Sequence, residues 1–397
     1  MLPRSWKVDK LEIDHLSALL PRHRQHRLWR CLEEADLVLA FAIWNSFRGD
    51  HVEGPIFGTE SPKSSCQEFR IGWKGDNVIL LGVDGGGSHT RAVAVDGDGN
   101  LVATAQAGCG NYQIIGLDRL EVLIAELLEK LGVSADHVGL GLAGAGRDTE
   151  RESIEIKVQR RFGFRTTVVV SDAQVALTAA HAGGSGVIVI SGTGSIVLGR
   201  DQGGREARAG GWGPILGDDG SGYDIALAAL RAVLASRDGS GPATSLSNSL
   251  LGAVNLTDWE QLIPAVQRGE ISREAIAALS PAVFASAKQG DEVAGGIVDK
   301  AGSALGKLVV AVVRSLEMSG SIPLACVGGV FREIDFLWPR LAASLAATGT
   351  AVHRRDPLLP PVLGAVLLVA AAAPQVEPSK MIGNLKRLGG AIEARLE

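Results

Sequence analysis

Residues 77–105 read NVILLGVDGGGSHTRAVAVDGDGNLVATA, and this stretch decides the fold. An apolar run at 78–83 enters a glycine-rich turn, and a second β-branched run at 92–95 leaves it. Short β-branched runs between turn signals predict strands, and the composition DGDGN at 96–100 predicts a hairpin turn. The stretch therefore predicts strand, glycine-rich turn, strand, turn and strand in succession.

The glycine-rich turn has the composition of an anion-binding site. Consecutive glycines at 85–87 let the backbone approach a ligand without a Cβ in the way. Their N–H groups, with the hydroxyls of Ser88 and Thr90, can line a concavity that attracts an anion. Asp84, at the mouth of the turn, is suited to hold Mg²⁺ directly or through water. For this stretch alone, an ordinary tight hairpin is the alternative.

A second copy of the pattern lies at 187–199, VIVISGTGSIVLG. The repeat indicates two related halves that face one cleft, each offering a turn to the same polyphosphate. A dinucleotide fingerprint is excluded because its glycine turn opens a helix, whereas here a strand follows. GSALGK at 302–307 is not a Walker A loop, because it is too short between the glycines and Leu308 replaces Ser or Thr. It lies in a helical pattern and is interpreted as helix packing.

Length and composition describe an ordinary globular chain. The 397 residues carry a net charge of −5, with 46% hydrophobic and 21% charged residues, so two or three domains and no basic field for nucleic acid are expected. The cysteines have no metal-ligand spacing, which favours reduced cytosolic thiols: Cys31, Cys66, Cys109 and Cys326. No signal-peptide pattern opens the chain, and the most apolar window, 358–373, is too short to span a bilayer. We expect a soluble cytoplasmic protein with no membrane partner.

Predicted elements after the first hairpin alternate between helix and strand. The first part gives a mixed α/β unit, with helices at 117–131, 147–162 and 173–182 and strands at 137–142 and 166–170. The second part, after its hairpin and a glycine-rich segment at 210–222, gives helices at 223–235, 259–267, 272–288, 291–318, 331–347 and 362–373, and strands at 323–327 and 352–354. Residues 236–257 are predicted as a loop, and residues 377–397 as a solvated helix.

These elements suggest a division into domains. Residues 78–182 and 183–375 form two α/β domains, and the last helix, 362–373, is a candidate for packing back on the first domain. Residues 376–397 form a polar tail. Residues 1–76 are an extension of unknown role, interpreted as a family-specific cap or as sequence upstream of the true start. A helix-turn-helix arm is the less favoured alternative for this extension.

Asp172 is the candidate catalytic carboxylate. It ends a valine-rich strand, at the position where open α/β sheets place ligands. A carboxylate there can orient an alcohol and accept its proton during phosphoryl transfer. The alternative is a helix N-cap, since Asp commonly opens helices. The location of Asp172 between the two hairpins favours the catalytic role.

The motif series resembles the N-acetylglucosamine kinase branch of the BadF/BadG-type ATPases, within the superfamily of acetate and sugar kinases and actin. The series is DGGGSHT, SDA, SGTGS, GGWGPILGDDGSG and VGGV, and it covers about residues 78–373. The resemblance implies two actin-like (ribonuclease H-like) α/β domains with a nucleotide cleft between them. It also implies ATP and Mg²⁺ as cofactors and a small amino sugar as substrate.

The same resemblance assigns roles to individual residues. Asp172 would take the proton from the sugar 6-hydroxyl, and Asp84 would lie near Mg²⁺. The ATP contacts would come from Gly85, Gly86, Gly87, Ser88, Gly192, Thr193, Gly328 and Gly329. The sugar contacts would come from Asn111, Gly211, Trp212, Gly213 and Asp218. A core aromatic is the alternative for Trp212, and Asp219 is expected to stabilise the next helix start rather than touch substrate.

The expected function is ATP-dependent phosphorylation of an amino sugar at its 6-hydroxyl, with N-acetylglucosamine first and glucosamine second. One rival is an activator ATPase of a 2-hydroxyacyl-CoA dehydratase or benzoyl-CoA reductase, but Cys109 and Cys326 do not reproduce its cluster-ligating pattern. Another is a non-catalytic sugar sensor, which would not need Asp84 and Asp172. The sequence does not fix the oligomeric state, and a homodimer is one alternative.

Overall fold

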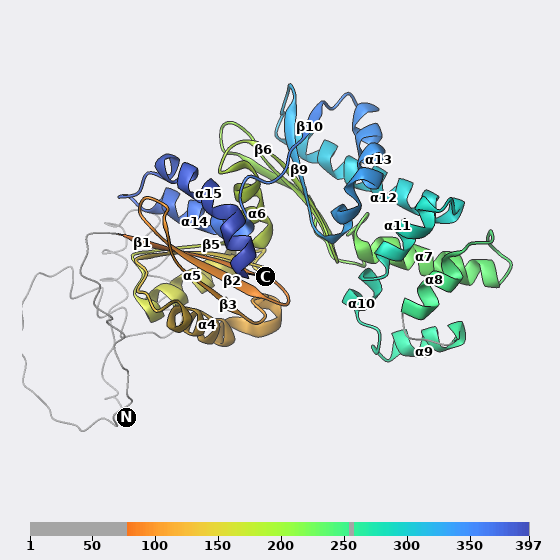
Figure 1. Cartoon of the computed structure of the whole chain (residues 1–397), viewed down its shortest axis with the longest axis horizontal. Helices are drawn as coiled ribbons and strands as arrows, with labels where there is room; N and C mark the ends of the chain where they lie inside the picture. The colour runs from red at the N-terminus through yellow and green to blue at the C-terminus, as the bar shows by residue number, and fades with distance from the viewer. Residues whose placement is uncertain (1–77, 254–257, 397) are drawn as a thin grey trace, which may run out of the picture. The chain divides into compact units, whose positions relative to one another are not determined.

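The structure is a computed structural model, and it describes residues 78–253 and 258–396 (Figure 1). The predictions for residues 1–76, including Cys31 and Cys66, lie outside the described residues. No helix in the described ranges is both long and apolar enough to cross a membrane.

The first sheet has the order β3-β2-β1-β4-β5. Its strands are β1 (Ile79–Gly85), β2 (Thr90–Asp96), β3 (Leu101–Ala107), β4 (His137–Leu142) and β5 (Thr166–Ser171). β2 and β3 are antiparallel hairpin strands, whereas β4 runs parallel to β1 and β5 runs parallel to β4. Gly85 therefore lies beside Leu142, and Leu142 beside Ser171, so the carboxyl ends of three strands meet at one sheet edge.

The second sheet repeats this topology, with the order β10-β9-β6-β7-β8. Its strands are β6 (Gly186–Ser191), β7 (Ser195–Arg200), β8 (Glu206–Gly210), β9 (Ile322–Val327) and β10 (Val352–Arg354). β6, β7 and β8 form the antiparallel meander, and β9 and β10 add in parallel. Both sheets place the first three strands as a meander and the next two beside the first strand. The predicted fold class, two actin-like α/β halves, is confirmed, although β8 was not predicted.

Helices cover both faces of the first sheet. They are α4 (Tyr112–Leu131), α5 (Asp148–Phe162), α6 (Asp172–His181), α14 (Pro361–Ala372) and α15 (Pro378–Leu396). Leu81 and Val83 pack with α4 and α5, whereas Leu80 packs with α14 and α15 on the opposite face (Figure 1). This division follows from the alternation of side chains along a strand.

The helix α14 lies close to the first sheet because the strands beneath it carry glycine. A Cβ at Gly82 would be 2.6 Å from the carbonyl oxygen of Val362, and a Cβ at Gly139 would be 2.2 Å from that of Ala365. Both distances are shorter than any real Cβ contact. The two glycines therefore set how closely α14 packs on β1 and β4.

The helix α6 contacts both sheets. It follows β5 of the first sheet, and its Ala176 and Leu177 pack in one cluster with Ile188 and Leu198 of the second sheet. It also packs tightly against α14, since a Cβ at Gly364 would be 2.2 Å from the carbonyl oxygen of Val175. Asp172 is therefore the first residue of a helix that packs against both sheets.

The second half has a larger helical part. Its helices are α7 (Gly222–Arg237), α8 (Leu246–Ala253), α9 (Leu262–Gln267), α10 (Arg273–Ala277), α11 (Ser280–Lys288), α12 (Glu292–Ser315) and α13 (Ile334–Ala346), with 3₁₀ turns η1 (Trp259–Gln261) and η2 (Gly329–Glu333). Gly302 and Gly306 on α12 lie against Arg340 and Ser344 of α13. The interpretation of 302–307 as helix packing is therefore confirmed.

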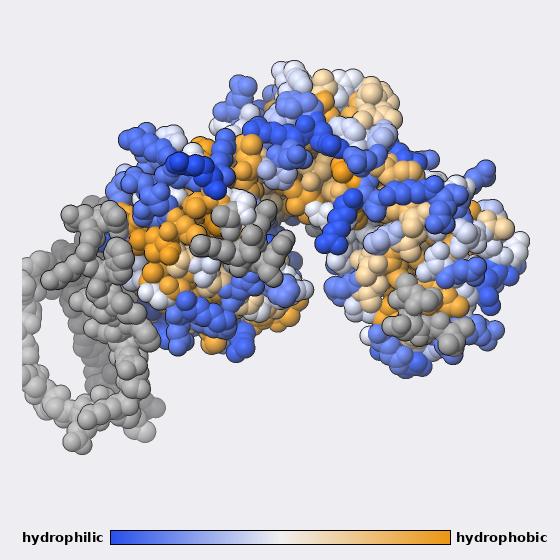
Figure 2. All heavy atoms as spheres, in the orientation of Figure 1, coloured by the Kyte–Doolittle hydropathy of each residue, from blue (hydrophilic) through white to orange (hydrophobic). Residues whose placement is uncertain are grey.

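Three sequence predictions about helices need correction. The loop predicted at 236–257 contains α8, because Leu246 and Leu250 are fully buried in the core of the second half. The single helix predicted at 272–288 is two helices, α10 and α11. The tail helix α15 is not simply solvated, because Met381, Leu385 and Ile392 are fully buried against the first sheet. Only its outward side is hydrophilic (Figure 2).

Candidate active site

The first glycine turn, between β1 and β2, is tightly hydrogen bonded. Gly86 N donates to the carbonyl oxygen of His89 at 3.0 Å, and Gly110 N donates to that of Gly86 at 2.9 Å. Gly87 and Ser88 are exposed, and a Cβ at Gly87 would meet nothing within 4 Å. Backbone N–H groups in an open, side-chain-free turn suit a phosphate.

Thr90 does not line this turn, which corrects the sequence prediction. Its side chain is fully buried, and its hydroxyl donates to the carbonyl oxygen of Gly108 at 2.8 Å. Gly110 packs directly on this hydroxyl, because a Cβ at Gly110 would be 2.4 Å from Thr90 Oγ1. Thr90 therefore fixes the loop that leads into α4 rather than a ligand.

Asp84 and Asp172 form a pair of carboxylates at the carboxyl edge of the first sheet. Burial and the nearby charge of Asp172 raise the pKa of Asp84 to about 6, and Arg91 lowers it in part. Asp172 is exposed at its own surface, but partial dehydration by the surrounding protein raises its pKa as well. Two carboxylates that resist ionisation together would be stabilised by a cation between them.

This donor set fits Mg²⁺, which prefers carboxylate oxygens and retains water ligands. Asp84 is the better placed of the two to hold the ion, because it is half-buried at the end of a fixed strand. Asp172 remains accessible to a substrate.

The N-cap alternative for Asp172 does not apply, because Ser171 caps α6. Ser171 Oγ accepts from Gln174 N at 3.3 Å, and Gln174 Oε1 accepts from Ser171 N at 3.2 Å. Asp172 Oδ1 accepts a short-range bond from Ala173 N, at 2.9 Å. The helix start is thus satisfied by its neighbour, and Asp172 is not needed for capping.

The second glycine turn, between β6 and β7, is bound to the loop before α7. Ser191 Oγ donates to the carbonyl oxygen of Gly220 at 2.9 Å, and Ser195 Oγ donates to that of Asp219 at 2.8 Å. Gly222 N donates to the carbonyl oxygen of Gly192 at 2.7 Å. Turn 191–195 and loop 218–222 therefore form one hydrogen-bonded unit.

The turn with Gly328 and Gly329 lies beside the same unit. Gly328 has φ of 110°, and a Cβ there would be 2.3 Å from the carbonyl oxygen of Ser191. Gly192 also approaches Gly329, since a Cβ at Gly192 would be 4.0 Å from Gly329 N. The residues predicted for adenosine and for phosphate in this half are therefore neighbours.

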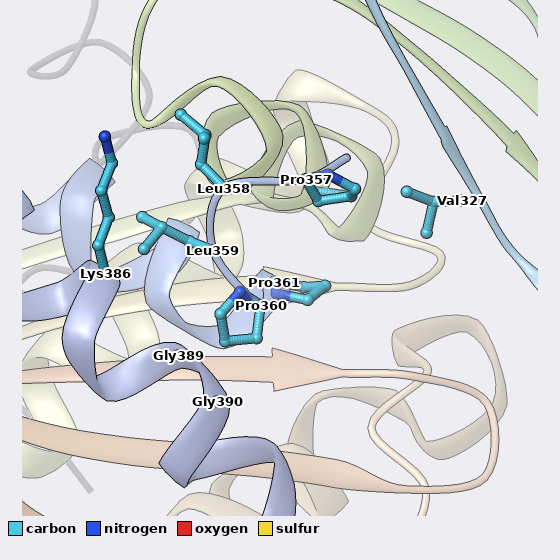
Figure 3. Close-up of a pocket in the computed structure, with 10 residues that line it drawn as sticks. Val327, Pro357, Leu358, Leu359, Pro360, Pro361, Lys386, Gly389 and Gly390 are labelled. Atoms are coloured by element: carbon cyan, nitrogen blue, oxygen red, sulfur yellow. The ribbon is translucent and has the colours of Figure 1, made fainter. Parts of the chain in front are cut away.

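A pocket of about 320 Å³ opens next to this turn (Figure 3). Its lining includes Ala176, one helical turn after Asp172, and Val327, which immediately precedes Gly328. Residues 357–361, which lead into α14, and Lys386, Gly389 and Gly390 of α15 complete the wall (Figure 3). The pocket therefore borders elements that carry predicted site residues from both halves.

The predicted sugar residues fall into two groups. Asn111 lies in the first half as the N-cap of α4, where its Oδ1 accepts from Gln113 N at 3.0 Å. A sugar contact from Asn111 would therefore use its amide N–H groups. The other group, Gly211, Trp212, Gly213 and Asp218, lies in the second half, and Gly211 N donates to the carbonyl oxygen of Ser195 at 2.9 Å.

Trp212 is not a core aromatic, because 64% of its surface is exposed. The guanidinium of Arg208 lies 4.8 Å from the ring centroid. Gly211 and Gly213 on either side have φ of 71° and 81°, which favours glycine. The indole is therefore accessible at the surface of the second half, where its ring can stack on an apolar sugar face.

Asp218 is buried, and its partner was missed in the sequence. Only 5% of Asp218 is exposed, and its Oδ2 lies 2.5 Å from Nη2 of Arg273 on α10. No motif marked Arg273, because it stands in an ordinary helical pattern. Asp219 is exposed, and Ser221 rather than Asp219 caps α7.

The structure has two repeats of one mixed sheet, each with a glycine-bent hairpin, and two carboxylates, Asp84 on β1 and Asp172 on α6. These features define a class: nucleotide-dependent phosphoryl transfer enzymes of the actin-like fold. The profile of the family described as BadF/BadG/BcrA/BcrD ATPase matches residues 81–369. The chain belongs to this family, which confirms the resemblance stated by the motifs.

Individual relatives agree with this assignment. The N-acetylmuramic acid/N-acetylglucosamine kinase of Clostridium acetobutylicum is 36% identical over 65% of this chain and 87% of its own length. The N-acetyl-D-glucosamine kinase of Dictyostelium discoideum is 34% identical over 73% of this chain and 97% of its own length. A crystal structure of a candidate N-acetylglucosamine kinase from Chromobacterium violaceum, 27% identical, superimposes with a TM-score of 0.60 over 74% of this chain and 99% of that one.

Proposed function

We propose that this protein transfers the γ-phosphoryl group of ATP to the 6-hydroxyl of N-acetylglucosamine. The enzyme class is an ATP-dependent sugar kinase of the BadF/BadG family. The choice of N-acetylglucosamine is supported by the substrates named for the relatives and by the motif GGWGPILGDDGSG at residues 210–222.

The observation that carries the proposal is the placement of Asp172. It is an exposed carboxylate at the first turn of α6, beside the half-buried Asp84, and Ser171 takes over the capping role. Its raised pKa makes it a stronger base than an ordinary aspartate. Asp172 can therefore accept the proton of the sugar hydroxyl as that oxygen attacks phosphorus.

Asp84 has a different role in this scheme. Bound Mg²⁺ would neutralise charge on the β- and γ-phosphates, and Asp84 would hold the ion at the end of β1. The two turns would contribute backbone N–H groups, from Gly87 and Ser88 in the first half and from Thr193 in the second, while the N–H groups of Gly86 and Gly192 close the turns themselves. Gly328 and Gly329 would support the adenosine.

The sugar would contact residues of both halves. Asn111 would donate its amide N–H groups from the first half, and Asp218 would accept from a sugar hydroxyl in the second half. Trp212 and its flanking glycines would cover one face of the ring. A sugar that contacts both halves would hold them in one arrangement. The closed site would then exclude water that competes with the sugar for the phosphoryl group.

A panel of sugars in a coupled ADP-release assay tests the proposal. The panel contains N-acetylglucosamine, glucosamine, N-acetylmuramic acid and glucose, with product position determined by ³¹P–¹H correlation NMR. The proposal expects the highest kcat/KM for N-acetylglucosamine and phosphorylation at the 6-oxygen. A clear preference for another sugar, or ADP release that no sugar stimulates, would contradict it.

A further inference from the structure

We propose that Arg273 is a positioning residue that fixes the Asp218 carboxylate and the turn at Thr193 in one arrangement, and so couples the sugar site to the phosphate site. The naming of these two sites depends on the proposed function. The bridge itself depends only on the geometry around Arg273.

The guanidinium of Arg273 contacts both segments. Its Nη2 lies 2.5 Å from Asp218 Oδ2 and donates to the carbonyl oxygen of Thr193 at 3.4 Å. Arg273 belongs to α10, which is outside both segments in the sequence. A single side chain on α10 thus contacts both loop 218–222 and turn 191–195.

The pair is packed closely against the turn. A Cβ at Gly194 would be 2.8 Å from Asp218 Oδ2 and 2.9 Å from Arg273 Nη2. Gly194 therefore has no room for a side chain while the ion pair is in place. Because of this close contact, movement of the ion pair would displace the backbone of turn 191–195.

The contacts around Asp218 restrain its backbone conformation. Asp218 has φ of 60°, in the left-handed region that non-glycine residues rarely adopt. Residues held in that region persist only when their surroundings over-determine them. The bond to Arg273, the burial of the carboxylate and the backbone bond from Ser221 N to Asp218 O at 3.1 Å supply that restraint.

The remaining surroundings of the guanidinium restrict its orientation. Among the described residues, Arg273 Nε is buried with no hydrogen-bond partner. A buried N–H group without a partner is unfavourable, and the two contacts of Nη2 offset part of that cost. The Tyr223 ring, with its centroid 5.8 Å from the guanidinium carbon, limits the orientations open to Arg273.

Three variants test the bridge. Arg273→Ala removes the guanidinium, and Arg273→Lys keeps a positive charge but cannot reproduce the planar fork. Arg268→Ala is the matched control, because Arg268 is exposed, lies close by in the sequence and pairs with Glu270 at the surface. Each is compared with the wild-type chain in steady-state kinetics and in hydrogen exchange measured by mass spectrometry without ligands.

We expect Arg273→Ala to raise the sugar KM by roughly 30-fold or more, because a buried carboxylate loses its partner. The nucleotide KM should also rise, by a smaller factor, because turn 191–195 loses the restraint from Arg273 while its backbone donors remain. Arg273→Lys should be intermediate. Peptides spanning 191–195 and 218–222 should exchange faster in both variants, and neither readout should change in Arg268→Ala.

A folded Arg273 variant with unchanged sugar KM and unchanged exchange in both peptides would overturn the inference. If Arg273→Ala does not fold, Arg273→Lys gives the decision. Hydrogen exchange needs no substrate, so the bridge can be refuted or supported even if the proposed substrate is wrong. Conversely, a wild-type enzyme that prefers another sugar refutes the substrate assignment alone, and the kinetic test is then made with that sugar.

Discussion

Asp84→Asn is expected to stabilise the ligand-free protein at neutral pH and to abolish its activity. Burial and the charge of Asp172 raise the pKa of Asp84 from 3.8 to about 6. A shift of that size corresponds to roughly 3 kcal/mol of preference for the protonated form. Asn has nearly the same shape as the protonated acid and carries no charge, so it would remove the penalty of ionisation. It would also remove a ligand for Mg²⁺.

The sign of the pH dependence follows from linkage. The folded protein holds the Asp84 proton more tightly than the unfolded chain, so the free energy of unfolding falls as the pH rises from 3.8 to about 6. Below this window both states are protonated and the penalty is absent. At pH 7.5 the full penalty of roughly 3 kcal/mol applies, and at pH 4.5 it is roughly 1 kcal/mol.

Thermal denaturation in EDTA at pH 4.5 and 7.5 measures this effect. With roughly 2 cal/mol/K of unfolding entropy per residue, Asp84→Asn should raise Tm by about 4 °C at pH 7.5 and by about a third of that at pH 4.5. The control is Asp98→Asn, an exposed carboxylate in the turn between β2 and β3. An equal change in Tm at both pH values, or a loss of stability that appears only at pH 7.5, would refute the reasoning.

Three further predictions concern the base, the packing and the tail. Asp172→Asn should lower kcat by about 10²- to 10⁴-fold and leave the Kd of ATP within a few-fold, measured by steady-state kinetics and calorimetry; near-normal kcat would remove the assigned role. Gly139→Ala should lower the free energy of unfolding by about 2 kcal/mol or more, because the new Cβ would meet the Ala365 carbonyl oxygen at 2.2 Å; an unchanged urea midpoint would show that α14 can shift. Leu385→Ala should lower it by roughly 2–5 kcal/mol in the same urea titration, whereas a surface-like change below about 0.5 kcal/mol would mean that α15 is not part of the core.

The elements that could be predicted from the sequence carry local signals. Both hairpins combine β-branched runs with glycines, so the repeat was visible without any tertiary contact. The helices α5 and α6 have caps and glycine or left-handed ends close to their predicted limits. The position of Asp172 followed from the end of a valine-rich strand.

Other elements depend on contacts distant in sequence. The strand β8, EARAG, has no β-branched residue and exists through its pairing with β7. The helix α8 is stabilised by burial of Leu246 and Leu250 in a core that α7, before it, and α11, after it, also form. Arg273 could not be identified, because its significance arises only when α10 packs beside Asp218. Thr90 was assigned to the phosphate turn because its buried hydroxyl bond to Gly108 cannot be read from composition.

A crystal structure with a non-hydrolysable ATP analogue, Mg²⁺ and N-acetylglucosamine tests the central claim most directly. The account predicts that the γ-phosphate is held by N–H groups of both glycine turns, at Gly87 and at Thr193, because the N–H groups of Gly86 and Gly192 already donate within their turns. It also predicts that the sugar 6-hydroxyl lies within hydrogen-bond distance of Asp172. A phosphate tail bound by only one of the turns, or a 6-hydroxyl directed away from Asp172, would contradict the account.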